Sequence, residues 1–142
     1  MRTGLGATDM ADLLEEPLIA VLATRRRDDT VLLSPVWFEW RDGGFNVWVE
    51  SADNGKARHV VRDPRATIVV ASIDEPYRGL EVRGEASLVQ EPEVFYEVLG
   101  RTAQRYYGTE RGASMVASYT TPGVVIRLEP GHVRAWDYGD GS

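Results

Sequence analysis

The clearest pattern in the sequence is a series of short apolar runs separated by turn-forming residues. Positions 80–88 alternate between apolar or small residues and charged or polar ones, which is typical of a strand with one buried face. Positions 18–24 are apolar at nearly every residue, which predicts a strand buried on both faces. Further strands are expected over positions 31–40, 45–50, 66–73, 124–128 and 133–136.

Proline, glycine and charged residues mark where these runs break. Pro35 interrupts the run at 31–40, and because proline cannot donate to a strand ladder, it predicts a sheet edge or a bulge. Positions 41–44 carry a hairpin-turn signal, and the Pro-Gly pair at 130–131 predicts a turn within the last apolar run. The three arginines and two aspartates at 25–29 predict a charged turn.

Helical periodicity is strongest over positions 91–107. Pro92 occupies a favourable first position, and Gly108 follows the last periodic residue. A shorter helix is expected over 10–16, and a loop with a single helical turn over 109–121. The apolar stripe of the long helix consists of Val94, Phe95, Val98, Leu99, Thr102, Ala103 and Tyr106.

A short helix with marked ends is predicted within positions 50–64. Asp53 or Asn54 can cap its start, because a short side-chain oxygen accepts a hydrogen bond from a free first-turn amide. Pro64 ends the helix by disfavouring a helical conformation at the preceding residue. The buried stripe is expected to consist of Ala57, Val60 and Val61.

The order of charges along this short helix is unusual. Lys56 and Arg58 lie in the first turn, where the helix dipole is already positive, and Asp63 lies at the end. Side-chain charge normally runs the other way, with an effect of roughly 0.3–1 kcal/mol per group. Free amides together with cations at a helix start suit a phosphate group. The alternative is a solvated basic face packed on a barrel, and this segment alone leaves both open.

Six or seven strands joined mostly by tight turns, with one long helix inserted late, predict an α+β fold. The expected architecture is a small antiparallel barrel with flanking helices. The length of 142 residues predicts a single domain over 1–142. A polar tail is expected over 137–142.

Composition narrows the class of protein. The chain has 22 acidic residues against 16 Lys and Arg, a net charge of −6 that argues against nucleic acid as a partner. No apolar run approaches the roughly 20 residues of a membrane span, and positions 1–14 lack a signal-peptide pattern, so a cytoplasmic protein is expected. The absence of Cys excludes disulfides and a thiolate nucleophile. His59 and His132 are far apart, which disfavours a catalytic triad or a zinc site.

Several segments carry a resemblance to a known family, in the order in which that family has them. Together they span nearly the whole chain, and they indicate that it resembles the pyridoxamine 5'-phosphate oxidase-like split β-barrels that bind FMN or coenzyme F420. It is most similar to the F420-dependent oxidoreductases of actinobacterial type. The matching segments are positions 20–24, 34–38, 56–58 with 62–65, 81–86 and 134–138.

The resemblance implies a split β-barrel homodimer with two cofactor sites at the subunit interface and a small-molecule substrate. Lys56 and Arg58 would hold the cofactor phosphate, and positions 34–37 would line the ring system. Tyr77 would border the ring or the substrate mouth, and Trp136 would reach toward the partner subunit. The full set of cofactor-binding residues implied in this way is Ser34, Pro35, Val36, Trp37, Glu50, Ser51, Lys56, Ala57, Arg58, Tyr77 and Trp136.

Two departures from the family pattern lie in the short helix. The chain has Asn54 and Gly55 where family members often carry Thr or Ser followed by a basic residue, and it has His59 where they often carry Asn. The loss of a cation next to the lysine would weaken phosphate binding. His59 either compensates for that loss or is an ordinary surface residue.

Three functional hypotheses follow. The first is an oxidoreductase in which coenzyme F420, or alternatively FMN, supplies hydride chemistry for a small conjugated or aromatic substrate. The anionic oligoglutamate tail of F420 would need a basic groove, with Arg25, Arg26, Arg27, Arg58 and Arg78 as candidates. The second is a non-catalytic carrier of flavin, haem or tetrapyrrole on the same barrel, with a histidine as haem ligand. The third, an ordinary hydrolase or metal enzyme, lacks a suitable set of residues.

Overall fold

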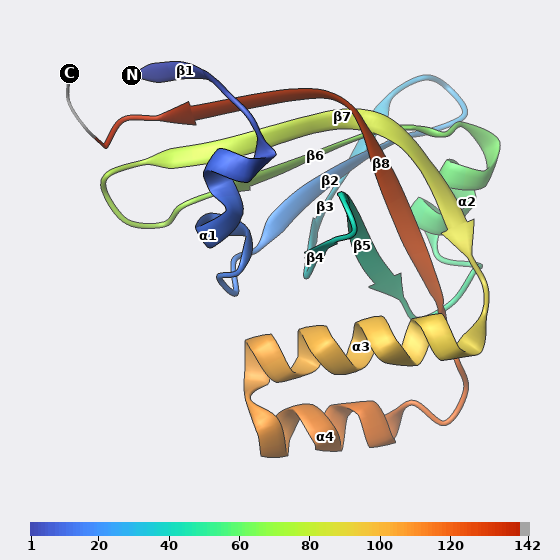
Figure 1. Cartoon of the computed structure of the whole chain (residues 1–142). Helices are drawn as coiled ribbons and strands as arrows, with labels where there is room; N and C mark the ends of the chain where they lie inside the picture. The colour runs from blue at the N-terminus through green and yellow to red at the C-terminus, as the bar shows by residue number, and fades with distance from the viewer. Residues whose placement is uncertain (140–142) are drawn as a thin grey trace.

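The protein folds into a curled antiparallel sheet with helices at its ends (Figure 1). The computed structural model describes residues 1–139, so the end of the predicted polar tail, 140–142, lies outside the described residues. Seven strands follow the order β3-β2-β6-β7-β8-β5-β4, and β1 pairs with β8. The strands are β1 (Arg2–Leu5), β2 (Ala20–Arg25), β3 (Val31–Val36), β4 (Glu39–Arg41), β5 (Gly44–Val49), β6 (Arg65–Ala71), β7 (Arg78–Val89) and β8 (Val124–Asp137).

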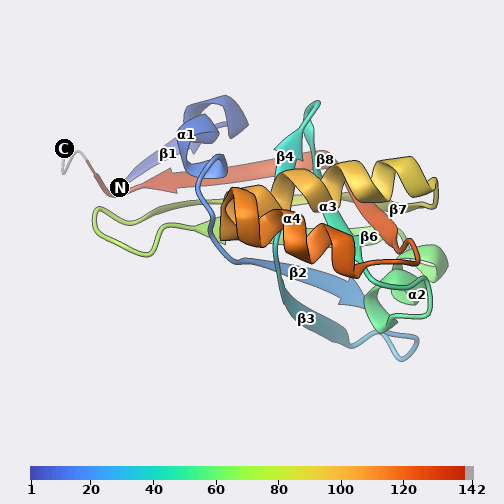
Figure 2. The ribbon, with the colours of Figure 1, turned by 90° about the horizontal axis from the view of Figure 1, so that it is seen from below.

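The helices flank this sheet, and the predicted α+β split-barrel architecture is confirmed. A 3₁₀ turn η1 (Ala7–Met10) leads into the single turn of α1 (Ala11–Leu14), and α2 (Gly55–Arg62) connects β5 to β6. The long helix α3 (Pro92–Tyr107) begins with Pro92 and ends at Gly108, as predicted. Together with α4 (Thr109–Ser118) it forms an antiparallel hairpin beside the sheet (Figure 2).

The helix α4 corrects the prediction of a loop with one helical turn over 109–121. Its ten residues lack a side-chain cap, so local signals at its start are weak. A β-carbon at Gly112 would lie 2.9 Å from the carbonyl oxygen of Ala103, so this glycine allows α4 to approach α3 closely. Packing between the two helices therefore stabilises a segment that its own sequence marks poorly.

The last strand corrects a second prediction. β8 runs without a turn from Val124 to Asp137, and the Pro-Gly pair at 130–131 forms a bulge against β7. Gly84 pairs with Pro130 there, and a β-carbon at Gly84 would lie 1.9 Å from the carbonyl oxygen of Glu129. The backbones thus come too close for any other residue at position 84. A bulge bends a strand without ending it, which is why the turn signal was misleading.

Pro35 does lie on an edge strand, as predicted, but it does not interrupt that strand. It pairs with Val21 within β3, and the break comes after Val36. β3 pairs only with β2 in the described sheet, so the missing N–H of Pro35 interrupts no ladder on its outer side.

The apolar core fills the concave face of the sheet. Leu22, Ile68 and Val82 from neighbouring strands are each at most 1% exposed, and Leu13 of α1 closes one end. A second cluster, centred on Phe95 and Val125, attaches α3 to the opposite face near the end of β5.

Two burial predictions were wrong. Ile19 is 53% exposed, and β2 alternates between buried and half-buried residues, so the 18–24 segment is not buried on both faces. Val61 is 68% exposed, which limits the buried stripe of α2 to Ala57 and Val60. None of the helices within residues 1–139 combines the length and the apolar character that crossing a membrane requires.

Candidate functional site

The start of α2 is organised by a small hydrogen-bond network. Asn54, rather than Asp53, caps the helix, because its Oδ1 accepts a 3.1 Å hydrogen bond from the amide of Lys56. The same oxygen lies 3.2 Å from the Lys56 ammonium, and the Asn54 amide group donates to Glu50 at 2.9 Å. The residues before α2 therefore fix the Lys56 side chain near the first turn of the helix. The turn is completed by Ser51, whose hydroxyl accepts from the amide of Asp53.

A cavity of about 280 Å³ opens beside Lys56. Segments far apart in the sequence meet there: the end of β3, the end of β5, the start of α2, and the α3–α4 hairpin. We call this cavity the aromatic pocket. It is lined by Pro35, Val36, Trp37, Trp48, Glu50, Lys56, Tyr107 and Met115.

Five of the predicted cofactor-binding residues thus lie around one cavity: Pro35, Val36, Trp37, Glu50 and Lys56. Ser34 is half-buried and pairs with Leu22 on the edge strand. The side chain of Ala57 is fully buried beneath α2, so only its backbone could reach a ligand. Arg58 is exposed on the neighbouring surface of the helix.

Trp37 is the centre of the aromatic wall of this pocket. Its indole stacks on Tyr106, with ring centroids 4.5 Å apart and an angle of 4° between the planes. Tyr107 meets the indole edge-on at 4.8 Å, and Trp48 does so at 6.2 Å. Tyr106 therefore covers one face of the Trp37 indole, and a flat ligand in the pocket would stack against the aromatic surface that Tyr106, Tyr107 and Trp48 leave accessible.

Two buried polar groups near this wall have no hydrogen-bond partner within residues 1–139. One is Nε1 of Trp48, and the other is the guanidinium of Arg105, at Nε and one terminal nitrogen. A buried donor without an acceptor costs about 1–3 kcal/mol, so such groups are rare in folded proteins. Because Trp48 lines the aromatic pocket, a cofactor that brings polar oxygens to it would fit this donor.

The electrostatics of the pocket combine one cation with one anion. The pKa of Glu50 is lowered by its own backbone amide and by the hydrogen bond from Asn54, with Lys56 adding to the effect. Glu50 is therefore ionised at neutral pH. An anion held by Lys56 would have to approach from the side of α2 that Glu50 does not occupy.

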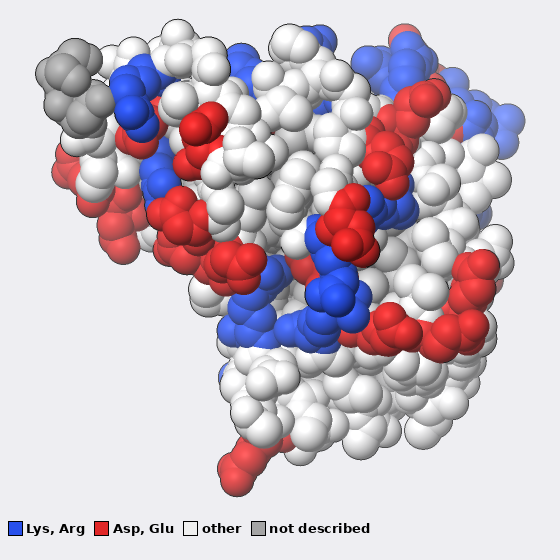
Figure 3. Space-filling view, in the orientation of Figure 1, with Lys and Arg blue, Asp and Glu red and all other residues white. Residues whose placement is uncertain are grey.

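A basic hollow of about 270 Å³ lies on the other side of α2, lined by Arg27, Arg58, His59 and Arg62. Figure 3 shows basic side chains gathered at the upper right, where the β2–β3 turn meets α2. Nδ1 of His59 lies 3.0 Å from the hydroxyl of Thr24. Burial, followed by the charges of Arg62, Arg26 and Arg58, lowers the pKa of His59 below its ordinary value.

The arginines near this hollow differ in whether they are already engaged. Arg25 forms an ion pair with Asp29 at 3.4 Å, and Arg62 donates to the carbonyl of Arg25. The side chains of Arg27 and Arg58 have no hydrogen bond or ion pair within residues 1–139. These two cations are therefore available to an anion from outside the chain.

Tyr77 and Trp136 lie at the far end of the sheet. Trp136 pairs with Gly79 at the start of β7, whereas Trp48 of the aromatic pocket pairs with Val125. The ten residues of β8 between positions 125 and 136 separate them by roughly 30 Å. Within one chain, neither Tyr77 nor Trp136 can reach the aromatic pocket.

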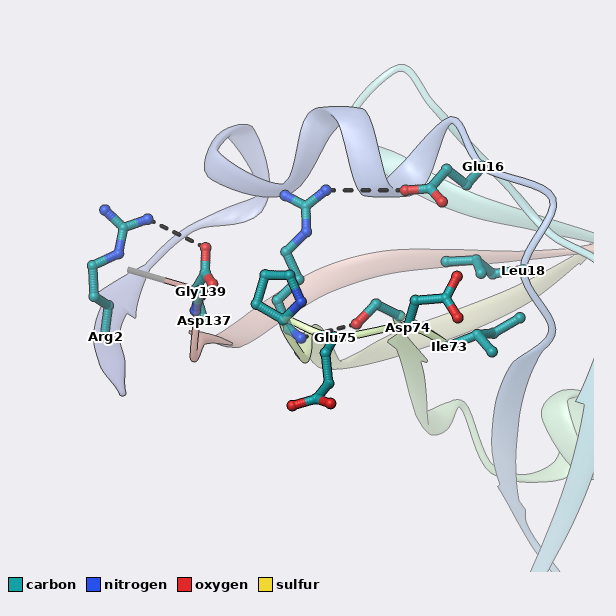
Figure 4. Close-up of a pocket in the computed structure, with 11 residues that line it drawn as sticks. Arg2, Glu16, Leu18, Ile73, Asp74, Glu75, Asp137 and Gly139 are labelled. Carbon is teal, nitrogen blue, oxygen red and sulfur yellow. Dashed lines mark hydrogen bonds and ion pairs between the residues drawn. The ribbon is translucent and has the colours of Figure 1, made fainter. Parts of the chain in front are cut away.

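A larger cavity, about 550 Å³, also lies at that far end (Figure 4). Arg78, a candidate for the basic groove, is found here and not near α2. It pairs with Asp12 at 2.5 Å and lies 3.9 Å from Glu16. Among residues 1–139 no group of acidic or histidine side chains could hold a metal ion.

Three residues of the aromatic pocket were not predicted from sequence: Trp48, Tyr107 and Met115. Trp48 had a usable signal, because it occupies an outward position in a strand whose neighbours point into the core. Tyr107 and Met115 had none, since both depend on α4 folding back along α3.

The chain was compared with protein families, curated proteins and solved structures. The model of the pyridoxamine 5'-phosphate oxidase family matches residues 8–137. No curated protein matches the chain significantly.

Among solved structures, the conserved hypothetical protein Rv2991 from Mycobacterium tuberculosis is 28% identical with a TM-score of 0.82, and the match covers 94% of this chain and 86% of that one. An F420 reductase is 32% identical with a TM-score of 0.67, covering 86% of this chain and 93% of the other. The heme storage protein HutZ from Vibrio cholerae is 19% identical with a TM-score of 0.68, over 89% and 91% of the two chains, and shares the fold.

Proposed function

The chain belongs to the pyridoxamine 5'-phosphate oxidase family, and on that premise we propose that it is an oxidoreductase that binds coenzyme F420 in the aromatic pocket. Its substrate would be a small conjugated or aromatic molecule. The observation that carries this proposal is the aromatic pocket itself, which joins a lysine at a helix start to the flat face of Trp37.

The residues around the pocket have distinct roles in this proposal. Lys56 and the free amides of the first turn of α2 would hold the cofactor phosphate, because a helix start and an ammonium both favour an anion. Pro35, Val36 and Trp37 would hold the ring system, and the indole N–H of Trp48 would be available to one of its polar groups. A bound deazaflavin supplies hydride chemistry, while the apolar walls exclude water from the reacting face.

The basic hollow favours F420 over FMN. FMN ends at its phosphate and needs only Lys56 and its surroundings, whereas F420 continues into an anionic tail. Arg27 and Arg58 are unpaired cations on the side of α2 away from the aromatic pocket, where such a tail would emerge. The 32% identity to an F420 reductase supports the same choice.

A homodimer would complete the site. The convex face of the sheet carries exposed or half-exposed apolar side chains on neighbouring strands: Ile19, Val21, Leu33, Pro35 and Val69. None of the helices within residues 1–139 covers them, and an uncovered apolar sheet face is typical of a surface that pairs with another subunit. Since Pro35 borders both this face and the aromatic pocket, Tyr77 and Trp136 of a partner copy could approach the site that they cannot reach within their own chain.

The test is a titration of the purified protein with F420 and, separately, with FMN, followed by the fluorescence of the cofactor. We expect saturable binding of F420 with clearly higher affinity than FMN. Tight FMN binding without F420 binding would reject the choice of cofactor, and binding of neither would reject the oxidoreductase proposal. Analytical ultracentrifugation of the same sample tests the homodimer.

A further inference from the structure

The outer wall of the aromatic pocket comes from the α3–α4 hairpin, and it carries one cation that the proposed cofactor does not use. Tyr107, the last residue of α3, and Met115 of α4 both line the pocket. Arg111 precedes Met115 by four residues, which places the two on the same face of α4. Arg111 therefore lies one helical turn from the pocket wall.

The position of the Arg111 guanidinium is fixed by an aromatic contact. Its central carbon lies 3.6 Å above the ring centroid of Tyr107, the shortest cation–π distance among the described residues. Because Tyr107 itself borders the pocket, this contact keeps the exposed guanidinium of Arg111 next to the pocket rim.

Arg111 has no counter-charge among residues 1–139. None of the described carboxylates forms an ion pair with it, and its stacking on Tyr107 leaves the guanidinium N–H groups without an acceptor in residues 1–139. Its place in the first turn of α4 is also unfavourable for the helix, since the dipole is positive there. The interaction with the helix dipole therefore does not explain an arginine at this position.

We propose that Arg111 selects the substrate of the aromatic pocket, namely a flat conjugated ring that carries a carboxylate. The substrate ring would stack on the side of the cofactor ring that faces Met115 and away from Trp37, and the carboxylate would take two parallel hydrogen bonds from the guanidinium. Lys56 does not compete for this group, because in the proposed function, on which this inference rests, it is occupied by the cofactor phosphate.

The experiment compares two probes with the same ring, 2-naphthoate and the neutral 2-naphthamide. Both are titrated calorimetrically into wild-type protein saturated with cofactor, and again into protein without cofactor. We expect 2-naphthoate to bind about tenfold more tightly than 2-naphthamide, the effect of one charged hydrogen-bonded pair. In Arg111→Gln the two affinities should become equal, and in Arg111→Lys part of the preference should remain.

Arg41→Gln is the matched control, since Arg41 is an exposed arginine at the end of β4 and should leave the preference unchanged. The proposal is overturned if wild-type protein shows no preference for 2-naphthoate, or if Arg111→Gln retains it. A separate titration of Arg111→Gln with F420 should match the wild type. Loss of cofactor binding in the wild type would reject the proposed function, whereas normal cofactor binding with no carboxylate preference rejects only the role of Arg111.

Discussion

The two ends of the sheet each carry a cavity, and the larger one is the less suited to bind a ligand. The cavity at the start of β7 measures about 550 Å³, against about 280 Å³ for the aromatic pocket beside α2. Figure 3 shows acidic side chains at the left, around the larger cavity, and basic ones at the upper right, near α2. The two cavities differ in whether their charged side chains are already paired with opposite charges from the protein.

In the larger cavity the protein already neutralises its own cations. Arg78 pairs with Asp12, and Arg2 pairs with Asp137 at 3.4 Å. In the aromatic pocket Lys56 has a neutral hydrogen-bond partner, Asn54, and the indole N–H of Trp48 has none within residues 1–139. Unsatisfied donors beside an aromatic surface are a better indication of a binding site than volume is.

The largest expected effect tests this comparison directly. Lys56→Ala should weaken F420 binding by about 1.5–3 kcal/mol, the range of a hydrogen bond to a charged group, which corresponds to roughly 10- to 150-fold. Asp74→Asn, which changes a charge at the larger cavity, should leave the affinity unchanged. An unaltered dissociation constant in Lys56→Ala, measured by cofactor fluorescence, would remove Lys56 from the site.

A second experiment compares the ion pairs that support the two cavities. Glu39 is 5% exposed and receives two 2.8 Å hydrogen bonds from Arg101, which attaches α3 to β4 behind the aromatic pocket. Glu39→Gln should lower the free energy of unfolding by about 2 kcal/mol, because it replaces the buried charged acceptor of Arg101 with a neutral one and leaves only the exposed Glu97, 3.8 Å away, as its counter-charge. Asp12→Asn at the exposed Arg78 pair should cost less than about 1 kcal/mol. Denaturant unfolding measures the free energy of unfolding of both variants. Equal losses in the two variants would contradict the claim that the Glu39–Arg101 pair stabilises the protein more than the Asp12–Arg78 pair.

Lowering the pH should also reduce the stability that the Glu39–Arg101 pair contributes. Burial of Glu39 raises its pKa, but the hydrogen bonds from Arg101 and Asn46 outweigh burial and lower the pKa overall. The unfolded chain therefore takes up the proton first as the pH falls. The contribution of this carboxylate to stability is present above its ordinary pKa of 4.5 and is lost as the pH falls through the lower folded value. Glu39→Gln should show less loss of stability over that range than the wild type.

The smallest effect concerns His59 in the basic hollow. Its pKa is lowered from the ordinary value of 6.5, so protonation destabilises the free protein as the pH falls below 6.5. An anion in the hollow would offset this repulsion, and we expect F420 affinity to rise about threefold between pH 7.5 and pH 5.5. His59→Asn should remove the rise, while FMN affinity should follow no such trend. A pH-independent affinity in the wild type would place the anionic tail elsewhere.

The sequence predicted features that depend on neighbouring residues. The short helix α2, a cap at Asp53 or Asn54 and its end before Pro64 follow from local chemistry, as do the limits of α3. The ordered set of family segments predicted the architecture, and it also contained four of the residues that surround the aromatic pocket: Pro35, Val36, Trp37 and Lys56.

Features that depend on distant contacts could not be predicted in this way. α4 forms because Gly112 lets it pack on α3, and β8 continues through its Pro-Gly bulge because β7 supports it on one side. Tyr107 and Met115 enter the pocket only through that hairpin. Tyr77 and Trp136 illustrate a different problem. The family resemblance assigned them to the cofactor site, but within one chain they lie at the opposite end of the sheet from the aromatic pocket.

The central claim is that the start of α2 and the face of Trp37 together hold one cofactor. A crystal structure of the protein soaked with F420 tests it most directly. The account predicts the phosphate within hydrogen-bond distance of Lys56 Nζ and the deazaflavin ring in the aromatic pocket against Trp37. A complex in which Lys56 points into solvent, or in which the ring occupies the larger cavity beside Arg78, would contradict it.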